Sequence, residues 1–364
     1  MTDGARVISG AGTITATADG NVRVSQLRST NADALATAIQ VKNPPASMAG
    51  SRAGRLRQFD GGDRWIVLAM VGVPTILHVA LVWIPTIASI LLSFTDWNGI
   101  RFSDMHWVGL KNYEQIFTAF RRDFFQALIN NSVLLVFLFI GPTALGIGLA
   151  YLLDRDIRGT RFYQGIFFTP VVLSLAVVGF MWQSVVYSTE NGLATQMFGG
   201  GNPVDWIGNQ SFLIPFGEDY GVSWNFVAIL VAIAWRHTGY IMVLYLAGLK
   251  GVDSSLREAA MLDGSNEWQV FRHVVFPSLK PINVVIAVIT VIEALRAFDI
   301  IYVLNTPRKT EVLSILTTNN LLGEGGGNVG RGSAYATILF ILCFGFVIWY
   351  VTNHYRNTQE GADT

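Results

Sequence analysis

The sequence predicts an all-α integral membrane protein that crosses the bilayer six times. Hydrophobic residues make up 51% of the 364 residues and charged residues only 14%, whereas soluble domains carry about 25% charged residues. The apolar residues also gather in six runs, each of at least the roughly 20 residues that cross a hydrocarbon core. The predicted spans are Trp65–Leu92, Asn131–Leu153, Gly165–Tyr187, Trp224–Leu249, Pro281–Leu304 and Ala334–Tyr355.

Residues 1–60 differ in composition from the segments that follow. They are rich in Ala, Thr, Ser, Asn and Gly and contain one aromatic residue, Phe59. We expect a mostly disordered cytoplasmic tail, because such a segment buries too little apolar surface to offset the loss of chain entropy. A short helix around Asn31–Val41 is the alternative.

The distribution of Lys and Arg predicts the orientation of the spans. If the N-terminus is inside, the flanks that face the cytoplasm carry twelve of these residues and the outer loops carry seven. Because the excess of positive charge lies on the cytoplasmic side of membrane proteins, we expect both termini in the cytoplasm. The formal net charge of zero gives no reason to expect a nucleic acid as a partner.

The segment between the fourth and fifth predicted spans, Lys250–Lys280, is too polar to cross a membrane. Ser254 or Ser255 is positioned to cap a helix through Leu256–Leu262. Glu258 lies in the first turn of that helix, where a carboxylate interacts favourably with the helix dipole.

A turn and a second helix complete this segment. Gly264 allows a sharp backbone turn at little steric cost. The second helix is predicted at about Glu267–Val275 and is expected to stop at Pro277. The pattern indicates a helix–turn–helix on the cytoplasmic face, with an exposed surface for a partner.

The same residues resemble the EAA loop of binding-protein-dependent ABC importer permeases. That loop reads E-A-A, three residues, Gly, nine residues, Ile, one residue, Leu-Pro. The matching residues here are Glu258, Ala259, Ala260, Gly264, Val274, Phe276 and Pro277. The sequence departs only by Val for Ile and Phe for Leu, and both changes keep an apolar side chain.

The resemblance covers about residues 65–356 and extends to two further stretches. Residues 94–97 and 108–113 are similar to the first outer loop of carbohydrate-type permeases, and residues 297–304 are similar to their fifth span. These stretches indicate sugar importers related to the large maltose permease subunit. The implied fold is the type I ABC importer permease, with a cytoplasmic EAA coupling helix–turn–helix.

This resemblance implies a domain organisation and a set of partners. Residues 61–356 would form the permease domain, which includes the EAA loop at 250–280, and residues 357–364 a C-terminal tail. We call residues 250–280 the coupling segment, because in this family the loop docks on a cytoplasmic ATPase dimer. The other expected partners are a second homologous permease, an extracytoplasmic sugar-binding protein and the lipid of a bacterial inner membrane. The expected ATPase contacts are Glu258, Ala259, Ala260, Gly264 and Pro277.

The chain itself is expected to be a transport subunit and not an enzyme. Its glycine-rich stretch at 325–332 has Arg331 and Gly332 where a phosphate-binding loop needs Lys and Ser or Thr. We interpret this stretch as a flexible outer loop, so ATP and Mg²⁺ are expected on a separate ATPase chain. With Cys343 as the single cysteine and no metal-ligand spacing, no cofactor or metal is expected here.

Ionisable residues inside the predicted spans mark the candidate substrate path. Arg236 lies near the middle of the fourth span, and Glu293, Arg296 and Asp299 follow at three-residue steps in the fifth. Such residues are costly in a membrane unless they pair or face a water-filled cavity. For Arg296 and Asp299, internal salt bridges and a polar vestibule are both left open.

The resemblance places sugar contacts on the helices that flank the coupling segment. The implied substrate-path residues are Arg236, His237, Tyr240, Thr290, Glu293, Ala294 and Ala297. Tyr240 could stack on a pyranose ring, while Arg236 and Glu293 could hydrogen-bond to its hydroxyl groups. The expected substrate is a di- or oligosaccharide or a glycoside, with an α-glucoside as the first choice.

Three alternatives differ from this interpretation in the substrate, in the energy source, or in being an enzyme rather than a transporter. The same architecture could import a glycerol-phosphate or a polyol, because Arg236 would suit a phosphate. A proton-coupled secondary transporter would use Glu293, Arg296 and Asp299 as a relay, but it leaves the EAA pattern unexplained. A membrane-embedded enzyme is disfavoured because the five His residues are scattered.

Overall fold

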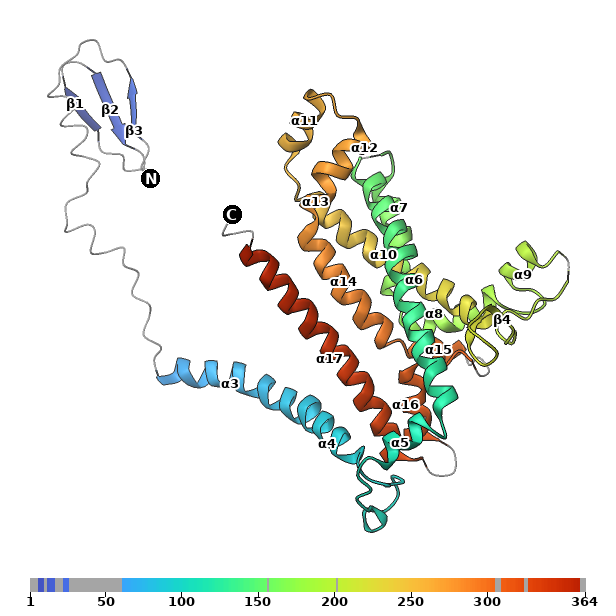
Figure 1. The fold of residues 1–364 in the computed structure, drawn as a ribbon. Coiled ribbons are helices and arrows are strands. Elements are labelled where there is room, and N and C mark those ends of the chain that lie inside the picture. Colours follow the sequence, from blue (N-terminus) through green and yellow to red (C-terminus); the bar gives the residue numbers. More distant parts are fainter. Residues whose placement is uncertain are drawn as a thin grey trace. The chain divides into compact units, whose positions relative to one another are not determined.

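The computed structural model describes residues 6–9, 12–16, 22–25, 61–155, 157–200, 202–304, 309–323 and 327–360. The chain folds as two units, Met1–Leu77 and His78–Thr364, each of which packs mainly on itself. Their helices and strands are labelled in Figure 1.

Three short strands lie within the segment that the sequence analysis predicts to be a disordered tail. β1 (Arg6–Ser9), β2 (Gly12–Ala16) and β3 (Val22–Ser25) pair antiparallel in that order. Each strand contains β-branched residues, which favour extended backbone. The alternative helix around Asn31–Val41 falls outside the described residues.

Four helical runs are long and apolar enough to cross a membrane. They are Trp65–Leu92, Arg121–Asp154, Trp224–Lys250 and Val329–Tyr350. The first comprises most of α3 (Gly61–His78), a π-helical turn (Val79–Trp83) and α4 (Ile84–Leu92). The others correspond to α6 (Arg121–Asp154), α10 (Trp224–Leu249) and α17 (Val329–Glu360).

A bent pair of helices supplies a fifth candidate span. α7 (Thr160–Val172) meets the run Leu175–Val186 at an angle of 101°. That second run contains α8 (Leu175–Met181) and a π-helical turn (Trp182–Val186). The described part of the chain therefore gives four or five candidate spans, and the predicted number of six stays a prediction.

The segment predicted as the fifth span is not one continuous helix. It forms α14 (Lys280–Leu295) and α15 (Asp299–Leu304), which residues 296–298 separate. The break is stable because side chains from other segments donate hydrogen bonds to carbonyl groups near it. The amide of Asn131 donates to the Ala294 carbonyl at 2.9 Å, and the hydroxyl of Ser314 donates to the Ala297 carbonyl.

Shorter elements connect these helices. Outside the coupling segment they are a 3₁₀ turn (Phe102–Asp104), α5 (Lys111–Phe117), α9 (Leu193–Phe198), β4 (Phe212–Pro215), β5 (Gly221–Ser223) and α16 (Leu313–Leu322). β4 and β5 form an antiparallel hairpin before α10. The helix that contains the last predicted span, Ala334–Tyr355, is longer than that span at both ends. α17 begins at Val329, within the expected glycine-rich loop, and extends past Arg356 to Glu360.

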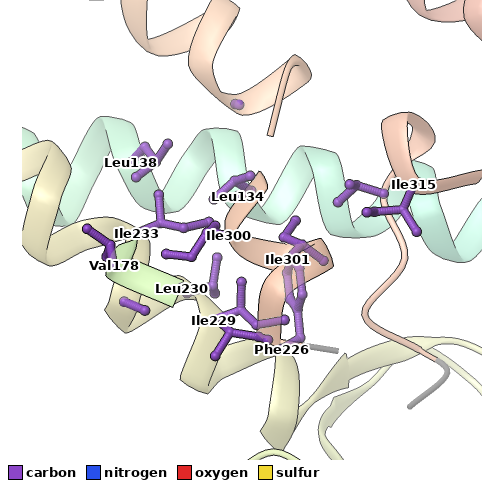
Figure 2. Packing of buried hydrophobic residues seen from close by; sticks show 14 of the residues in the cluster. Leu134, Leu138, Val178, Phe226, Ile229, Leu230, Ile233, Ile300, Ile301 and Ile315 are labelled. Atoms are coloured by element: carbon purple, nitrogen blue, oxygen red, sulfur yellow. The ribbon is translucent and has the colours of Figure 1, made fainter. Parts of the chain in front are cut away.

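The largest apolar core of the second unit lies between α6, α10 and α15. Figure 2 shows Leu134 and Leu138 of α6 gathered with Ile233 of α10 and Ile300 of α15, and all four are buried. Close approach of α6 and α10 depends on Gly146, where an added Cβ would lie 2.7 Å from the Ile241 side chain. Small residues at such crossings are typical of helix packing in membranes.

Three amide side chains on α6 bind the backbone of segments far away in the sequence. Gln126 exchanges hydrogen bonds with the N–H and C=O groups of Gly221 at 3.2 and 2.8 Å. Asn130 donates to the carbonyl groups of Lys309 and Glu311. Asn131 accepts from the Leu313 N–H at 3.0 Å, in addition to its bond to Ala294. The N-terminal half of α6 thus positions β5, the start of α16 and the end of α14.

Replacing Asn131 by Leu should destabilise the protein strongly. The introduced leucine side chain cannot form hydrogen bonds, so the buried Ala294 carbonyl and Leu313 N–H would lose the partner that Asn131 provides. Each orphaned group costs about 1–3 kcal/mol, so we expect the apparent melting temperature in detergent to fall by about 5–10 °C. The control is Ser132→Leu on the neighbouring exposed position, which should change it by less than about 2 °C. Equal melting temperatures for Asn131→Leu and the wild type would refute the bridging role.

Candidate functional site

An ion pair between α10 and α14 forms the centre of the candidate substrate path. Nη1 of Arg236 lies 2.9 Å from Oε1 of Glu293, and the two side chains are 23% and 24% exposed. Ionised side chains within membrane spans are stable when they pair or face water. The two side chains are therefore paired and still accessible to a ligand.

A second polar contact joins the same two helices, from the residue after Arg236 on α10 to a residue one turn before Glu293 on α14. His237 and Thr290 are buried, and Nε2 of His237 lies 3.3 Å from Oγ1 of Thr290. Thr290 precedes Glu293 by three residues on α14, so the two residues lie on neighbouring turns of one face. Nε of Arg236 is buried and has no hydrogen-bond partner within the described residues. The guanidinium group thus keeps a buried N–H donor that is unused among the described residues.

The other three predicted path residues have different surroundings. Tyr240 is partly exposed, one turn along α10 from Arg236, and its ring centroid lies 6.5 Å from that of His237. Ala294 is fully buried in the core against α6. Ala297 is partly exposed in the break between α14 and α15. The structure thus joins four of the seven residues in two contacts and places Tyr240 beside them, whereas Ala294 belongs to the packed side of α14.

Arg296 and Asp299 are both exposed. Within the part of the chain that the structure describes, neither makes an ion pair. Glu293 pairs across to α10 rather than with Arg296, three residues along its own segment. The salt bridges that would give these two residues a structural role are therefore not seen there, and a place in the polar vestibule stays a prediction. No group of three or more potential metal ligands lies together among the described side chains.

The coupling segment folds as a helix, a turn and a second helical run, as its sequence predicts. α11 spans Ser254–Leu262, and Gly264 follows in the left-handed region with φ of 85°. The predicted N-cap is wrong: Asp253 caps α11, and its carboxylate accepts from the Ser255 N–H at 2.9 Å. This hydrogen bond lowers the pKa of Asp253.

The second helical run of the coupling segment is longer than predicted. It passes through α12 (Glu267–Val270), a π-helical turn (Phe271–Val275) and α13 (Phe276–Ser278). Asn266 and Gln269 form a capping box at its start, a signal that the Asn-x-x-Gln spacing could have revealed. The expected stop at Pro277 is wrong, because Pro277 lies in the first turn of α13, where a missing N–H costs little.

One surface of the coupling segment is exposed, and we call it the open face of the segment. Glu258 and Ala259 are exposed, Ala260 is partly exposed, and Leu262 and Trp268 are 88% and 65% exposed. A Cβ added to Gly264 would meet no atom within 4 Å, so its positive φ is what requires glycine within this chain. Apolar side chains so exposed outside the membrane indicate a surface that a partner covers.

Two ion pairs, overlooked in the sequence, join the coupling segment to the end of α6. Nη1 of Arg257 lies 2.8 Å from Oδ2 of Asp154, and Arg155 pairs with Glu267. Arg257 also donates through Nη2 to the Leu249 carbonyl at the end of α10, at 3.0 Å. The position of α11 is therefore set by α6 and α10 together.

The chain is similar to membrane components of transport systems. Residues 46–356 match the family described as binding-protein-dependent transport system inner membrane component. The xylose/arabinose import permease protein XacH of Haloferax volcanii is 30% identical over 83% of this chain and 92% of its own length. The alpha-glucoside transport system permease protein AglF of Rhizobium meliloti is 30% identical over 86% of this chain and 89% of its own.

A solved structure shares the fold. It is the crystal structure of a bacterial ABC transporter involved in the import of the acidic polysaccharide alginate. One of its chains matches 81% of this chain and 96% of its own length, with a TM-score of 0.68 at 19% identity. At that identity the likeness establishes the fold and nothing about the ligand.

Replacing Asp253 by Ala should loosen α11, and replacing Ser254 by Ala should not. The carboxylate of Asp253 satisfies a backbone donor at the helix start, and loss of such a cap makes the first turn open more often. We expect amide hydrogen exchange in α11 to become about fivefold faster in Asp253→Ala. Equal exchange rates in the two variants would contradict this assignment of the cap.

Proposed function

The chain belongs to the family of binding-protein-dependent transport system inner membrane components, and from this we propose that it is one permease subunit of an ATP-driven importer of a di- or oligosaccharide or a glycoside. Its relatives are permeases of carbohydrate ABC transporters. A relative named for alpha-glucoside transport supports an α-glucoside as the first candidate substrate.

The observation that carries the substrate class is the Arg236–Glu293 pair with its neighbours. Arg236 offers N–H donors, including the unused Nε, and Glu293 offers carboxylate acceptors. A sugar hydroxyl group can donate and accept at once, so it can bind between these two side chains. Tyr240 lies within reach to stack on a sugar ring.

The charge balance of this pair favours a neutral sugar or polyol over a glycerol-phosphate. Glu293 already compensates the charge of Arg236, so a phosphate would have to displace the carboxylate and leave it without its partner. Such an exchange is costly where the dielectric is low. A proton-coupled secondary transporter is disfavoured because the chain belongs to a family of binding-protein-dependent transport components.

We propose six spans with both termini in the cytoplasm, and a translocation path that a second homologous permease completes. An extracytoplasmic binding protein would deliver the sugar on the outer side. A cytoplasmic ATPase dimer, which holds ATP and Mg²⁺, would cover Glu258, Ala259, Ala260, Gly264 and Pro277. The exposed apolar side chains of the coupling segment support such a cover.

Replacing Glu293 by Gln should weaken sugar recognition. The substitution keeps the shape of the side chain but removes the charge that pairs with Arg236. Since a hydrogen bond to a charged group contributes about 1.5–3 kcal/mol, we expect at least about a tenfold rise in the KM of uptake in proteoliposomes that hold the complete transporter. Glu190→Gln, at an exposed position away from the path, serves as the control. An unchanged KM for Glu293→Gln would exclude Glu293 from the substrate path.

Changing the open face of the coupling segment should release the ATPase. Glu258→Lys reverses an exposed charge, and Gly264→Val places a β-branched residue at φ of 85°. We expect each variant to lose a P-loop ATPase that co-purifies with the wild-type chain in mild detergent. Glu218→Lys, at an exposed position beyond β4, should retain it. Recovery of the wild-type chain without any ATPase would refute the importer proposal itself.

A further inference from the structure

Four charged side chains alternate in sign where the coupling segment meets α6. Asp154 and Arg155 are consecutive at the end of α6, and they pair with Arg257 on α11 and Glu267 on α12. The Asp154 and Arg257 side chains are 12% and 27% exposed, whereas Arg155 and Glu267 are 43% and 69% exposed. Exposed pairs contribute little, so the Asp154–Arg257 pair is the stronger connection.

The second helical run of the coupling segment packs on α6, because Val270 and Val275 belong to the same buried apolar cluster as residues of α6. α11 itself has no buried residue, and a cavity of about 180 Å³ lies between the end of α6 and the two helices. Because side chains around a cavity have few atoms to pack against, directed contacts contribute to the position of α11. Arg257 supplies two of these, one to Asp154 and one to the Leu249 carbonyl.

The other end of α6 reaches the candidate substrate path. α6 has 34 residues, so it is about 50 Å long. Pro142 interrupts its backbone hydrogen bonds, but the Leu138 carbonyl accepts instead from Oγ1 of Thr143 at 2.9 Å. Asn131, beyond this point, holds the carbonyl of Ala294, the residue next to Glu293. One helix therefore contacts both the coupling segment and the helix that carries the polar pair.

We propose that Asp154 and Arg257 are positioning residues that make the coupling segment move as one body with α6. A displacement of α11 by the ATPase would then reach α14 through α6 and Asn131, and not only through the chain that links α13 to α14. This inference rests on the proposed function, which assigns the ATPase contact to α11.

Charge exchange tests this role in the complete transporter. Arg257→Asp places two carboxylates together, and Arg257→Asp with Asp154→Arg restores an opposite pair. We expect the single change to lower sugar uptake per ATP hydrolysed by about fivefold, and the double change to restore at least half of it. A merely structural role would lower ATP hydrolysis and uptake together and leave their ratio unchanged. The matched control is Arg122→Asp at the exposed Arg122–Asp219 pair, which should leave the ratio as in the wild type.

A reversible cross-link gives a second test that does not depend on charge. Asp154→Cys and Arg257→Cys are combined with Cys343→Ala, which removes the single native cysteine. A bifunctional methanethiosulfonate reagent then joins the two positions. If α11 and α6 move together, the cross-link replaces the missing ion pair. The cross-linked transporter then shows at least half of the wild-type ratio of uptake to ATP hydrolysis, and the ratio falls when the reducing agent is added.

The results of the two tests distinguish a failure of this inference from a failure of the proposed function. Loss of uptake on cross-linking, with recovery on reduction, would show that α11 moves relative to α6 and would overturn the inference. An unchanged uptake ratio in Arg257→Asp would overturn it as well. In both cases a wild-type chain that co-purifies with an ATPase and imports sugar would leave the proposed function intact.

Discussion

The need to satisfy polar groups in a medium without water governs the second unit. In hydrocarbon an unpaired backbone group costs several kcal/mol, so any departure from regular helix requires a partner. The amides of Gln126, Asn130 and Asn131 on α6 provide such partners for β5, α16 and the end of α14. Without Asn131 and Ser314, the break between α14 and α15 would leave carbonyl groups unpaired. Because of this break, α14 ends shortly after Glu293, and the break thereby helps to fix the position of the Arg236–Glu293 pair.

The same constraint acts on the charged residues. Arg236 and Glu293 form one ion pair across two helices, and His237 and Thr290 form a neutral contact behind it. At the C-terminal end of α6, Asp154 and Arg257 form a second ion pair, with side chains 12% and 27% exposed, that helps to set the position of α11. The charges inside the chain are therefore paired in two places, between α10 and α14 and at the end of α6, for which we propose recognition and positioning respectively.

The sequence predicted the features that depend on short-range patterns. Hydropathy predicted the long apolar helices, and the helix signals around Gly264 predicted the helix–turn–helix. The spacing from Glu258 to Pro277 indicated the family, which the comparisons confirm. The sequence did not predict the break at residues 296–298, because the side chains that stabilise it come from distant positions 131 and 314. Competition between Asp253, Ser254 and Ser255 for one cap also depends on local backbone angles. The pairing of Arg236 with Glu293, 57 positions apart, likewise requires the packing of α10 against α14.

The neutrality of the Arg236–Glu293 pair has an electrical consequence. Moving one elementary charge through 100 mV of membrane potential takes about 2.3 kcal/mol. A guanidinium and a carboxylate held 2.9 Å apart present a dipole but no net charge to a sugar that carries none itself. Under the proposed function, the passage of a neutral sugar across this level would move no charge through the field. The membrane potential would then neither drive nor resist this step, and accumulation against a gradient would depend on the chemical energy of ATP.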